Sequence, residues 1–272
     1  TIDGMKKLDT LVVQDIFMTE TAWYADIILP ASAHAEKNGT FTNTNRQVQM
    51  GRKVVNPPGQ AREDLDIIID LAKSLGLNWE YNHASDVFKE MAQIMPSLKN
   101  ITWERVDNED SVTYPCEDKD KPGAEIVFSQ KFPTSSGLGK IVPTNVISPD
   151  ELPDHDFPFV LTTGRLLEHW HTGAMTRRSK SLDEIEPEAV VSMNSQDMSF
   201  LKLEPGNKVN VKTRRGSIKL SVRKDRELPK GMIFIPFCFS EAAANKLTNP
   251  QLDPYGKIPE FKYCAAKVEI SN

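Results

Sequence analysis

The segment KVNVKTRRGSIKLSVRKD, residues 208–225, constrains the fold of the second half of the chain more than any other stretch. Apolar and polar residues alternate on both sides of Arg215 and Gly216, a period of two that is typical of a β-hairpin with one buried face. Four further short apolar runs flank it along the chain: FPFVLTTG, EAVVSMN, GMIFIPF and KYCAAKVEIS. The second half is therefore expected to be a β-barrel or a β-sandwich with short helices.

The first half shows a different pattern. The runs DTLVVQD (9–15) and ADIILPAS (25–32) are apolar and β-branched, as expected of strands that are buried on both faces of a parallel sheet. Between them, IFMTETAWYA (16–25) predicts a helix. The order strand, helix, strand indicates a βαβ unit.

Two more helices and a long loop are expected after this unit. The stretch AREDLDIIIDLAKSLGL (61–77) has helical spacing, acidic residues in its first turn and Gly76 near its end. A second helix is expected around ASDVFKEMAQIM (84–95). The segment 36–59 is rich in Asn, Thr and Gly and ends in Pro-Pro-Gly, so it predicts a long structured loop.

Residues from about 100 to 153 contain many charged, Pro and Gly residues and no sustained periodicity. We therefore divide the chain into the C-terminal part of an α/β domain at 1–100, a connecting segment at 101–153 and a β-barrel domain at 154–272. Thr1 leads almost at once into an apolar strand, as though the chain began inside a domain. A fragment, a processed chain and a missing N-terminal part all remain open.

Composition limits the class of protein. The 272 residues are 39% hydrophobic and 26% charged, with a net charge of −5, which describes a soluble globular protein and disfavours nucleic acid as a partner. No apolar run approaches the roughly 20 residues of a membrane-spanning helix, and no signal peptide opens the chain. Cys116, Cys238 and Cys264 form no C-x-x-C pair, so we expect reduced thiols and a cytoplasmic location.

The loop TTGRLLEHWHTGAMTRRS, residues 162–179, contains many hydrogen-bond donors. It follows an expected strand, and Gly164 lets the backbone approach a ligand while Arg165 can contact a phosphate through two parallel bonds. With His169 and His171 it suits a phosphorylated heteroaromatic ligand. Composition alone favours a plainer interpretation, in which Trp170 is core and the histidines bond to local backbone. A metal site is the minor alternative, because only two ligands are local.

Polar residues at other places are also candidates. Gln14 and Asp15 end an expected strand, where open α/β sheets bind ligands, and Thr19 stands at an expected helix start. Helix capping is an equally good explanation for Asp15 and Thr19. Two polar loops offer further candidates, against the ordinary explanation of a solvated or bracing loop: Asn43, Asn45, Arg46 and Gln47 in the first, and Asn245, Asn249, Phe261 and Lys262 in the second.

Three stretches, taken together and in this order, resemble the C-terminal portion of molybdopterin-dependent formate dehydrogenase catalytic subunits, in the dimethylsulfoxide reductase superfamily. They are LVVQDIFMTETAWYADIILPASAHAEKNGTFTNTNRQVQ, TTGRLLEHWHTGAMTRRSKSLDEIEP and LTNPQLDPYGKIPEFKYCAAKVE. The resemblance covers nearly the whole chain. It implies an α/β domain followed by a double-psi β-barrel, both of which bind a bis(molybdopterin guanine dinucleotide) cofactor with Mo or W.

The resemblance also implies which residues contact the cofactor. In the first half, the implied guanosine contacts and their neighbours are Gln14, Asp15, Thr19, Arg46 and Gln47. In the barrel, the implied contacts are Thr163, Gly164, Arg165, Leu166, His169, His171, Thr172, Asn245, Phe261 and Lys262.

The family's metal ligand, formate-binding His and Arg, and four-cysteine iron–sulfur site match nothing in this sequence. The resemblance places them upstream of Thr1, so none of the residues here is expected to be catalytic or to bind metal, and this chain alone is predicted to be inactive. The implied partners are the N-terminal domains of the same subunit, formate, and iron–sulfur or flavin electron-transfer subunits. The alternatives are a nitrate reductase, a non-redox cofactor-binding module or chaperone, and a barrel that has lost its ligand.

Overall fold

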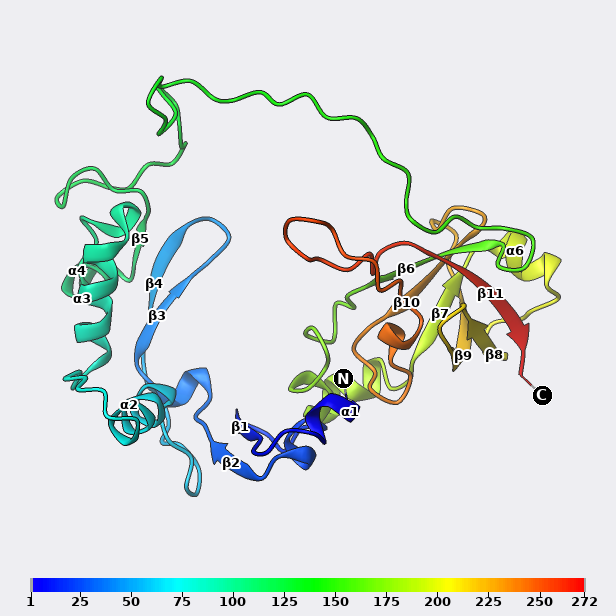
Figure 1. The fold of residues 1–272 in the computed structure, drawn as a ribbon, viewed down its shortest axis with the longest axis horizontal. Helices are drawn as coiled ribbons and strands as arrows, with labels where there is room; N and C mark the ends of the chain where they lie inside the picture. Colours follow the sequence, from blue (N-terminus) through cyan, green and yellow to red (C-terminus); the bar gives the residue numbers. More distant parts are fainter. Residues whose placement is uncertain (1, 272) are drawn as a thin grey trace. The chain divides into compact units, whose positions relative to one another are not determined.

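The computed structural model describes residues 2–271 and divides the chain into two compact units, one ending at Val142 and the other beginning at Pro143. The first unit contains helices and two small sheets (Figure 1). The second is built around a closed barrel of six strands. The parallel sheet with helices and the closed mixed barrel confirm the predicted fold class.

The parallel strands of the first unit are β1 (Val12–Asp15) and β2 (Ile27–Pro30), which pair from Val12 opposite Ile27 to Asp15 opposite Pro30. The prediction that these strands are buried on both faces is wrong for this chain, since Val12 is 46% and Ile27 48% exposed. The physical reason is that, within residues 2–271, β1 and β2 pair only with each other. A two-stranded sheet cannot cover its own apolar faces.

The helix predicted at 16–25 is also wrong. Between β1 and β2 the described chain forms only the short 3₁₀ helix η1 (Ala22–Tyr24). The Asp15 carboxylate accepts hydrogen bonds from the backbone N–H groups of Ile16 and Phe17, and the Thr19 hydroxyl accepts from that of Ala22 at 3.4 Å. These side-chain bonds favour consecutive turns over a regular helix.

The long loop predicted at 36–59 is instead largely a β-hairpin. After the 3₁₀ helix η2 (His34–Glu36), strands β3 (Gly39–Thr42) and β4 (Gln47–Gly51) pair antiparallel, and β5 (Ser111–Thr113) adds to β4. The Asn43 side chain closes the hairpin tip by bonding the backbone N–H of Gln47 at 3.0 Å. Local turn chemistry therefore allows a strand pair in a sequence that is rich in turn-forming residues.

The predicted helices after this hairpin are confirmed as α2 (Asp64–Ser74) and α3 (Ala84–Ile94). The short elements α1 (Ile2–Met5), η3 (Pro96–Leu98) and α4 (Trp103–Glu109) were not predicted. One core of the unit lies between α3, α4 and the β3–β4–β5 sheet, and its buried members are Val48, Phe88, Leu98, Ile101, Val106, Val112 and Cys116. Elements from the segment 101–153 thus contribute to this core.

The barrel of the second unit has the strand order β10-β6-β11-β8-β9-β7. Its strands are β6 (Phe159–Gly164), β7 (Val190–Met193), β8 (Lys208–Lys212), β9 (Ser217–Lys224), β10 (Met232–Pro236) and β11 (Cys264–Ile270). The hairpin predicted around Arg215 and Gly216 is confirmed as β8–β9. The pairs β6–β10 and β7–β9 are parallel and the others antiparallel.

Short helices connect the barrel strands, namely η4 (Thr176–Arg178), α5 (Lys180–Ile185), α6 (Ser195–Phe200) and η5 (Ala244–Lys246). Inward-facing residues such as Leu161, Val191 and Ile233 are fully buried. Because every second residue of each strand enters this core, the strand ends and the loops beyond them are left to carry polar groups. The loop after β6, residues 165–179, carries Arg165, His169, His171 and Thr172.

Candidate functional site

The carboxyl end of β6 brings together residues that lie almost 100 positions apart in the sequence. Strand β6 pairs antiparallel with β11, with Leu161 opposite Cys264. This register places Thr163 beside the segment that enters β11. The Thr163 hydroxyl donates to the Phe261 carbonyl at 2.8 Å, and the Lys262 ammonium donates to the Thr163 carbonyl at 2.6 Å.

The Lys262 ammonium is held in one place by these contacts. Its nitrogen lies 5.4 Å from the centre of the Phe261 ring and 5.7 Å from that of Phe237. A cation so close to two aromatic rings is attracted to their negative faces, while its remaining hydrogens stay available to an acceptor. The Lys262 side chain is exposed, so an anionic group can reach it.

Arg165 provides a second cation directly after Gly164. It is exposed, and its Nη2 donates to the His171 Nε2 at 3.5 Å. His171 has a left-handed backbone conformation (φ 49°) and its ring lies edge-on to Trp170, with centroids 4.6 Å apart. Thr172 next to it is exposed. The loop thus presents a guanidinium, an imidazole and a hydroxyl to solvent.

His169 is placed differently from His171. It is only 1% exposed, its Nε2 donates to the Glu186 carbonyl at 2.8 Å, and its ring lies edge-on to Phe239. Because a carbonyl can only accept, Nε2 carries the proton and Nδ1 is an acceptor. This buried Nδ1 has no hydrogen-bond partner among the described residues. The plainer interpretation of His169 accounts for one ring nitrogen and leaves the other unsatisfied.

The two histidines do not form a metal site. They lie in a loop, not on a strand, and one is buried while the other is exposed. Within residues 2–271, no group of three His, Cys, Asp or Glu side chains is arranged to hold a metal ion.

The remaining predicted barrel residues have different surroundings. Leu166 packs against the barrel core, and Asn245 is exposed in η5. Asn249 is buried and donates to Glu260 at 2.8 Å, so it braces the loop that leads to Phe261. The structure therefore assigns Asn249 the bracing role that the sequence left open.

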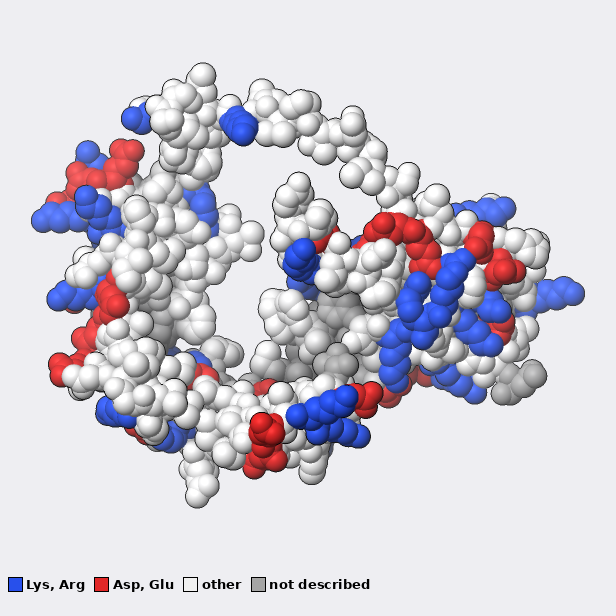
Figure 2. Space-filling view, in the orientation of Figure 1, with Lys and Arg blue, Asp and Glu red and all other residues white. Residues whose placement is uncertain are grey.

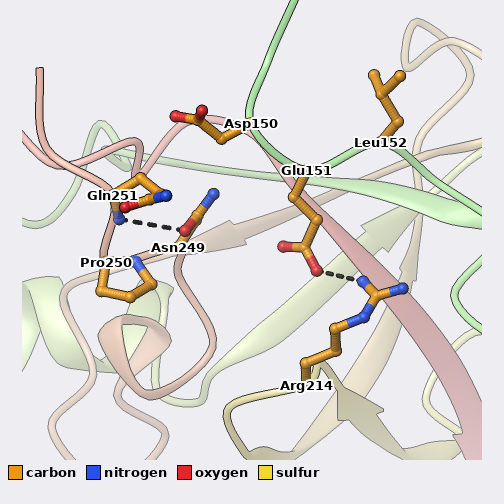
Figure 3. Close-up of a pocket in the computed structure, with 7 residues that line it drawn as sticks. All are labelled: Asp150, Glu151, Leu152, Arg214, Asn249, Pro250 and Gln251. Atoms are coloured by element: carbon orange, nitrogen blue, oxygen red, sulfur yellow. Dashed lines mark hydrogen bonds and ion pairs between the residues drawn. The ribbon is translucent and has the colours of Figure 1, made fainter.

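Beside Asn249 the barrel unit has a shallow hollow of about 480 Å³ (Figure 3). It is lined by Asp150, Glu151, Leu152, Arg214, Asn249, Pro250 and Gln251. The Glu151 carboxylate already forms ion pairs with Arg214 and Arg215. Because Arg214, the cation among these lining residues, is already paired with the carboxylates of Glu151 and Asp154, this hollow is a weaker candidate for binding an anion than the end of β6.

In the first unit, Gln14 belongs to a network that the sequence did not predict. Its side-chain amide donates to the Asp64 carboxylate at 2.7 Å, and Lys37 forms an ion pair with the same carboxylate. Lys37 also donates to the carbonyl of Ser32, whose buried hydroxyl has no partner among the described residues. Ser32 lies just beyond the carboxyl end of β2, and this position is the sequence signal that could have identified it.

Asp64 gives this network a pH dependence. Burial raises the pKa of its carboxyl, but hydrogen bonds from Lys37 and Gln14 outweigh burial and hold the pKa below its usual value of 3.8. A depressed folded-state pKa contributes stability above the unfolded-state pKa, and that stability is lost as the pH falls through the folded-state value. We expect Asp64→Asn to lower stability at pH 7, and this deficit to shrink as the pH falls below 3.8, in urea unfolding over a series of pH values. Asp66→Asn, at an exposed position on α2, is the control. An Asp64→Asn deficit that does not change as the pH is lowered contradicts this assignment.

Other predicted residues of the first unit are engaged locally. Asp15 and Thr19 accept backbone N–H groups in the turns after β1, where the expected helix does not form. Arg46, at the hairpin tip, donates to the carbonyls of Tyr114 and Glu125, and the Gln47 side chain bonds Asn43 at 2.9 Å. Gln14, Asp15 and Thr19 thus lie at and after the end of β1, whereas Arg46 and Gln47 lie on the β3–β4 hairpin.

Gly173 allows the loop after β6 to pack closely. It has φ +75°, and a Cβ there would lie 2.5 Å from the Cys238 carbonyl oxygen and 2.8 Å from the Arg177 Cγ. Gly173→Ala is therefore expected to lower the free energy of unfolding by about 1–3 kcal/mol. Gly206→Ala is the matched control, because Gly206 has φ +88° but open space around its Cα. Equal losses for the two variants, measured by urea unfolding, would remove the argument from close packing.

Two segments of the chain match models of known protein families. Residues 159–265 match the family model of the molydopterin dinucleotide binding domain, and residues 1–74 match that of molybdopterin oxidoreductases. The first unit thus contains a segment similar to molybdopterin oxidoreductases, and the barrel unit contains one similar to the dinucleotide-binding domain.

More particularly, the chain is homologous to formate dehydrogenase alpha subunits. It is 49% identical over 98% of its length to the F420-dependent formate dehydrogenase subunit alpha of Methanocaldococcus jannaschii, covering 40% of that protein. It is 32% identical to formate dehydrogenase H of Escherichia coli and 33% identical to the assimilatory nitrate reductase catalytic subunit of Bacillus subtilis, over 98% and 97% of the chain and 38% and 39% of those proteins. The chain thus spans about two fifths of the length of these relatives.

A solved structure shares the fold. Acetylene hydratase from Pelobacter acetylenicus aligns with 99% of this chain and 41% of its own, with a TM-score of 0.77 and 20% identity. Each helix within residues 2–271 is too short or too polar to traverse a lipid bilayer.

The family implies a molybdopterin dinucleotide, and the residues at the end of β6 fit one. Arg165 and Lys262 are exposed cations of the kind that would pair with its phosphates, and the buried Nδ1 of His169 has no hydrogen-bond partner among the described residues. The polar groups that remain unsatisfied are therefore of the kinds that such a ligand would satisfy.

Proposed function

We propose that this chain is the bis(molybdopterin guanine dinucleotide)-binding portion of a formate dehydrogenase alpha subunit, in an enzyme that oxidises formate to carbon dioxide and passes electrons to iron–sulfur centres. The observation that carries the proposal is the pair of exposed cations at the end of β6, Arg165 next to Gly164 and Lys262 on the Thr163 carbonyl; in the loop that follows, the His169 Nδ1 lies buried without a partner among the described residues. The 49% identity to a formate dehydrogenase alpha subunit supports the assignment of the substrate.

In this proposal the barrel residues bind one half of the cofactor. Lys262 and Arg165 contact phosphate oxygens, because both are cations at the end of a strand. The backbone of Thr163 and Gly164 approaches the ligand, and Phe261 covers an apolar face. The residues that complete this half by side-chain or packing contacts are Leu166, His169, His171, Thr172 and Asn245.

In the first unit, Gln14, Asp15 and Thr19 contact guanosine, with Arg46 and Gln47 nearby. Asp15 presents a carboxylate that can accept from a guanine N–H edge or a ribose hydroxyl. Its present bonds to the backbone N–H groups of Ile16 and Phe17 use one oxygen, Oδ1, which leaves Oδ2 for such a contact.

The bound cofactor supplies the metal, molybdenum or tungsten, at which formate is oxidised. This chain's residues bind and orient the cofactor and exclude water from it. The metal ligand, the formate-binding residues and the iron–sulfur cysteines belong, in this proposal, to preceding polypeptide of the same subunit. The chain alone is therefore inactive, and the whole enzyme works in the cytoplasm with electron-transfer subunits.

A nitrate reductase is the second candidate, because the chain is also 33% identical to an assimilatory nitrate reductase. The two candidates make opposite predictions for the intact enzyme, purified with its preceding polypeptide and supplied with a viologen dye. We expect formate to reduce the oxidised dye, and nitrate not to oxidise the reduced dye. Nitrate-dependent oxidation without formate-dependent reduction would replace the first proposal by the second.

A further inference from the structure

One guanidinium fastens the loop after β6, residues 165–179, to the segments around it. The Arg177 Nε donates to the Asp183 carboxylate of α5 at 2.8 Å. Its Nη1 donates to both carboxylate oxygens of Glu241, at 2.7 and 2.9 Å, and its Nη2 donates to the Pro187 carbonyl at 3.4 Å. Arg177 therefore joins this loop to α5, to the chain after α5 and to the chain after β10.

Packing as well as charge holds this side chain. The guanidinium carbon lies 4.6 Å from the centre of the Phe239 ring, and the side chain is only 22% exposed. The aliphatic stem lies against Gly173, where a Cβ would meet Arg177 Cγ at 2.8 Å. Each of its three guanidinium nitrogens has an acceptor within the barrel unit, so Arg177 is suited to hold the loop and not to bind a ligand itself.

The contacts of Arg177 extend to His169. The Phe239 ring that lies beneath the guanidinium is fully buried and meets the His169 ring edge-on, with centroids 5.7 Å apart. The other side of the His169 ring is fixed by its bond to the Glu186 carbonyl. The His169 ring, with its unpartnered Nδ1, is thus held between Glu186 and Phe239, and Phe239 in turn packs against Arg177.

We infer that Arg177 is a positioning residue for the cofactor, which acts by fixing the loop that carries Arg165, His169 and His171. The inference rests on the proposed function, because it gives the loop its ligand. Ion pairs from two different nitrogens, Nη1 to Glu241 and Nε to Asp183, set the loop in one conformation before the ligand binds. Such preorganisation slows dissociation, because a ligand is released when the groups around it separate.

The test measures how fast guanine nucleotide leaves the folded parent enzyme. Wild type, Arg177→Met, Arg177→Lys and the control Lys180→Met are purified with their other subunits, and protein-bound and released nucleotide are separated at intervals. The temperature is one at which circular dichroism shows every variant to be folded. Lys180 is exposed at the start of α5, so its replacement removes a cation next to the loop without breaking the contacts of Arg177.

We expect Arg177→Met to lose nucleotide about tenfold faster than the wild type, with Lys180→Met unchanged. Arg177→Lys should be intermediate, because a single ammonium nitrogen can pair with one carboxylate but cannot reach Asp183, Glu241 and Pro187 as the three guanidinium nitrogens do. Should Arg177→Met fail to fold, Glu241→Gln removes one partner only, and its release should also be faster. A purely structural role would lower the thermal midpoint and leave release from the folded enzyme at the wild-type rate, and that result overturns the inference.

The result for the wild type separates this inference from the proposed function. A wild-type enzyme without bound guanine nucleotide rejects the proposed function and, with it, any role of Arg177 toward the cofactor. A wild-type enzyme that holds the nucleotide, with release from Arg177→Met and Glu241→Gln as slow as from the wild type, rejects only the role of Arg177.

Discussion

Lys262→Met is expected to lower the guanine nucleotide content of the purified parent enzyme by about tenfold or more. A hydrogen bond to a charged group contributes roughly 1.5–3 kcal/mol, and each 1.4 kcal/mol changes an equilibrium constant about tenfold. The Lys262 ammonium is fixed by the Thr163 carbonyl and by two aromatic rings, so little side-chain freedom is lost when it binds a phosphate. Met keeps most of the length and the apolar stem of the side chain and removes its charge.

The control for this variant is Lys219→Met, which removes an exposed cation from β9. Both proteins are hydrolysed, and guanine is measured per mole of enzyme. If Lys262→Met and Lys219→Met retain the same guanine content as the wild type, Lys262 does not contact the dinucleotide. A loss in both variants would point to a general effect of net charge.

The largest effect on stability is expected for Leu161→Ala, at about 2–5 kcal/mol. Leu161 is 0% exposed at the centre of β6, and the strand that carries it also carries Thr163 and Gly164. Removing its side chain leaves a cavity that the closed barrel can fill only partly, because the neighbouring strands are joined on both sides.

Leu167→Ala is the matched control, since Leu167 is 96% exposed in the loop after β6. Its expected effect is within about 0.5 kcal/mol. Urea unfolding of both variants, followed by circular dichroism, measures the difference. Losses of similar size for the two leucines would mean that β6 is not part of the packed core of the barrel.

The sequence predicts the barrel better than the first unit, for a physical reason. The alternation in residues 208–225 reports a strand with one buried face, and the barrel contains both strands of that hairpin and the core that they cover. In the first unit, β1 and β2 have the composition of fully buried strands, yet Val12 and Ile27 are half exposed. Composition reports the environment to which a strand is suited, and this two-stranded sheet does not provide that environment.

Turn chemistry explains the other differences. The sequence predicts a loop where the structure has the β3–β4 hairpin. The polar residues at its tip are typical of turns, and the strands beside them are too short to give a clear pattern of their own. The sequence predicts a helix after Asp15. In the structure, the side chains of Asp15 and Thr19 instead accept hydrogen bonds from nearby backbone N–H groups, and β1 is followed by turns. Local side-chain bonds of this kind compete with regular structure over only a few residues.

For the candidate site, too, local features could be predicted from the sequence and long-range contacts could not. The donors of residues 162–179 could be predicted from a contiguous stretch, whereas the contact of Lys262 with Thr163 depends on the register of β6 and β11 and spans 99 positions. The network of Ser32, Lys37 and Asp64 was missed because its members are separated in sequence and each is ordinary by itself. Long-range register is the information that residue patterns lack.

The most direct test of the central claim is the content of the intact enzyme, purified from its native source with the polypeptide that precedes this chain. Guanine nucleotide is measured after acid hydrolysis, and molybdenum and tungsten are measured by mass spectrometry of the same sample. The proposal predicts about two guanine nucleotides and one atom of molybdenum or tungsten per alpha subunit, because the cofactor has two dinucleotides around one metal. Pure, folded enzyme that contains neither guanine nucleotide nor either metal would contradict it.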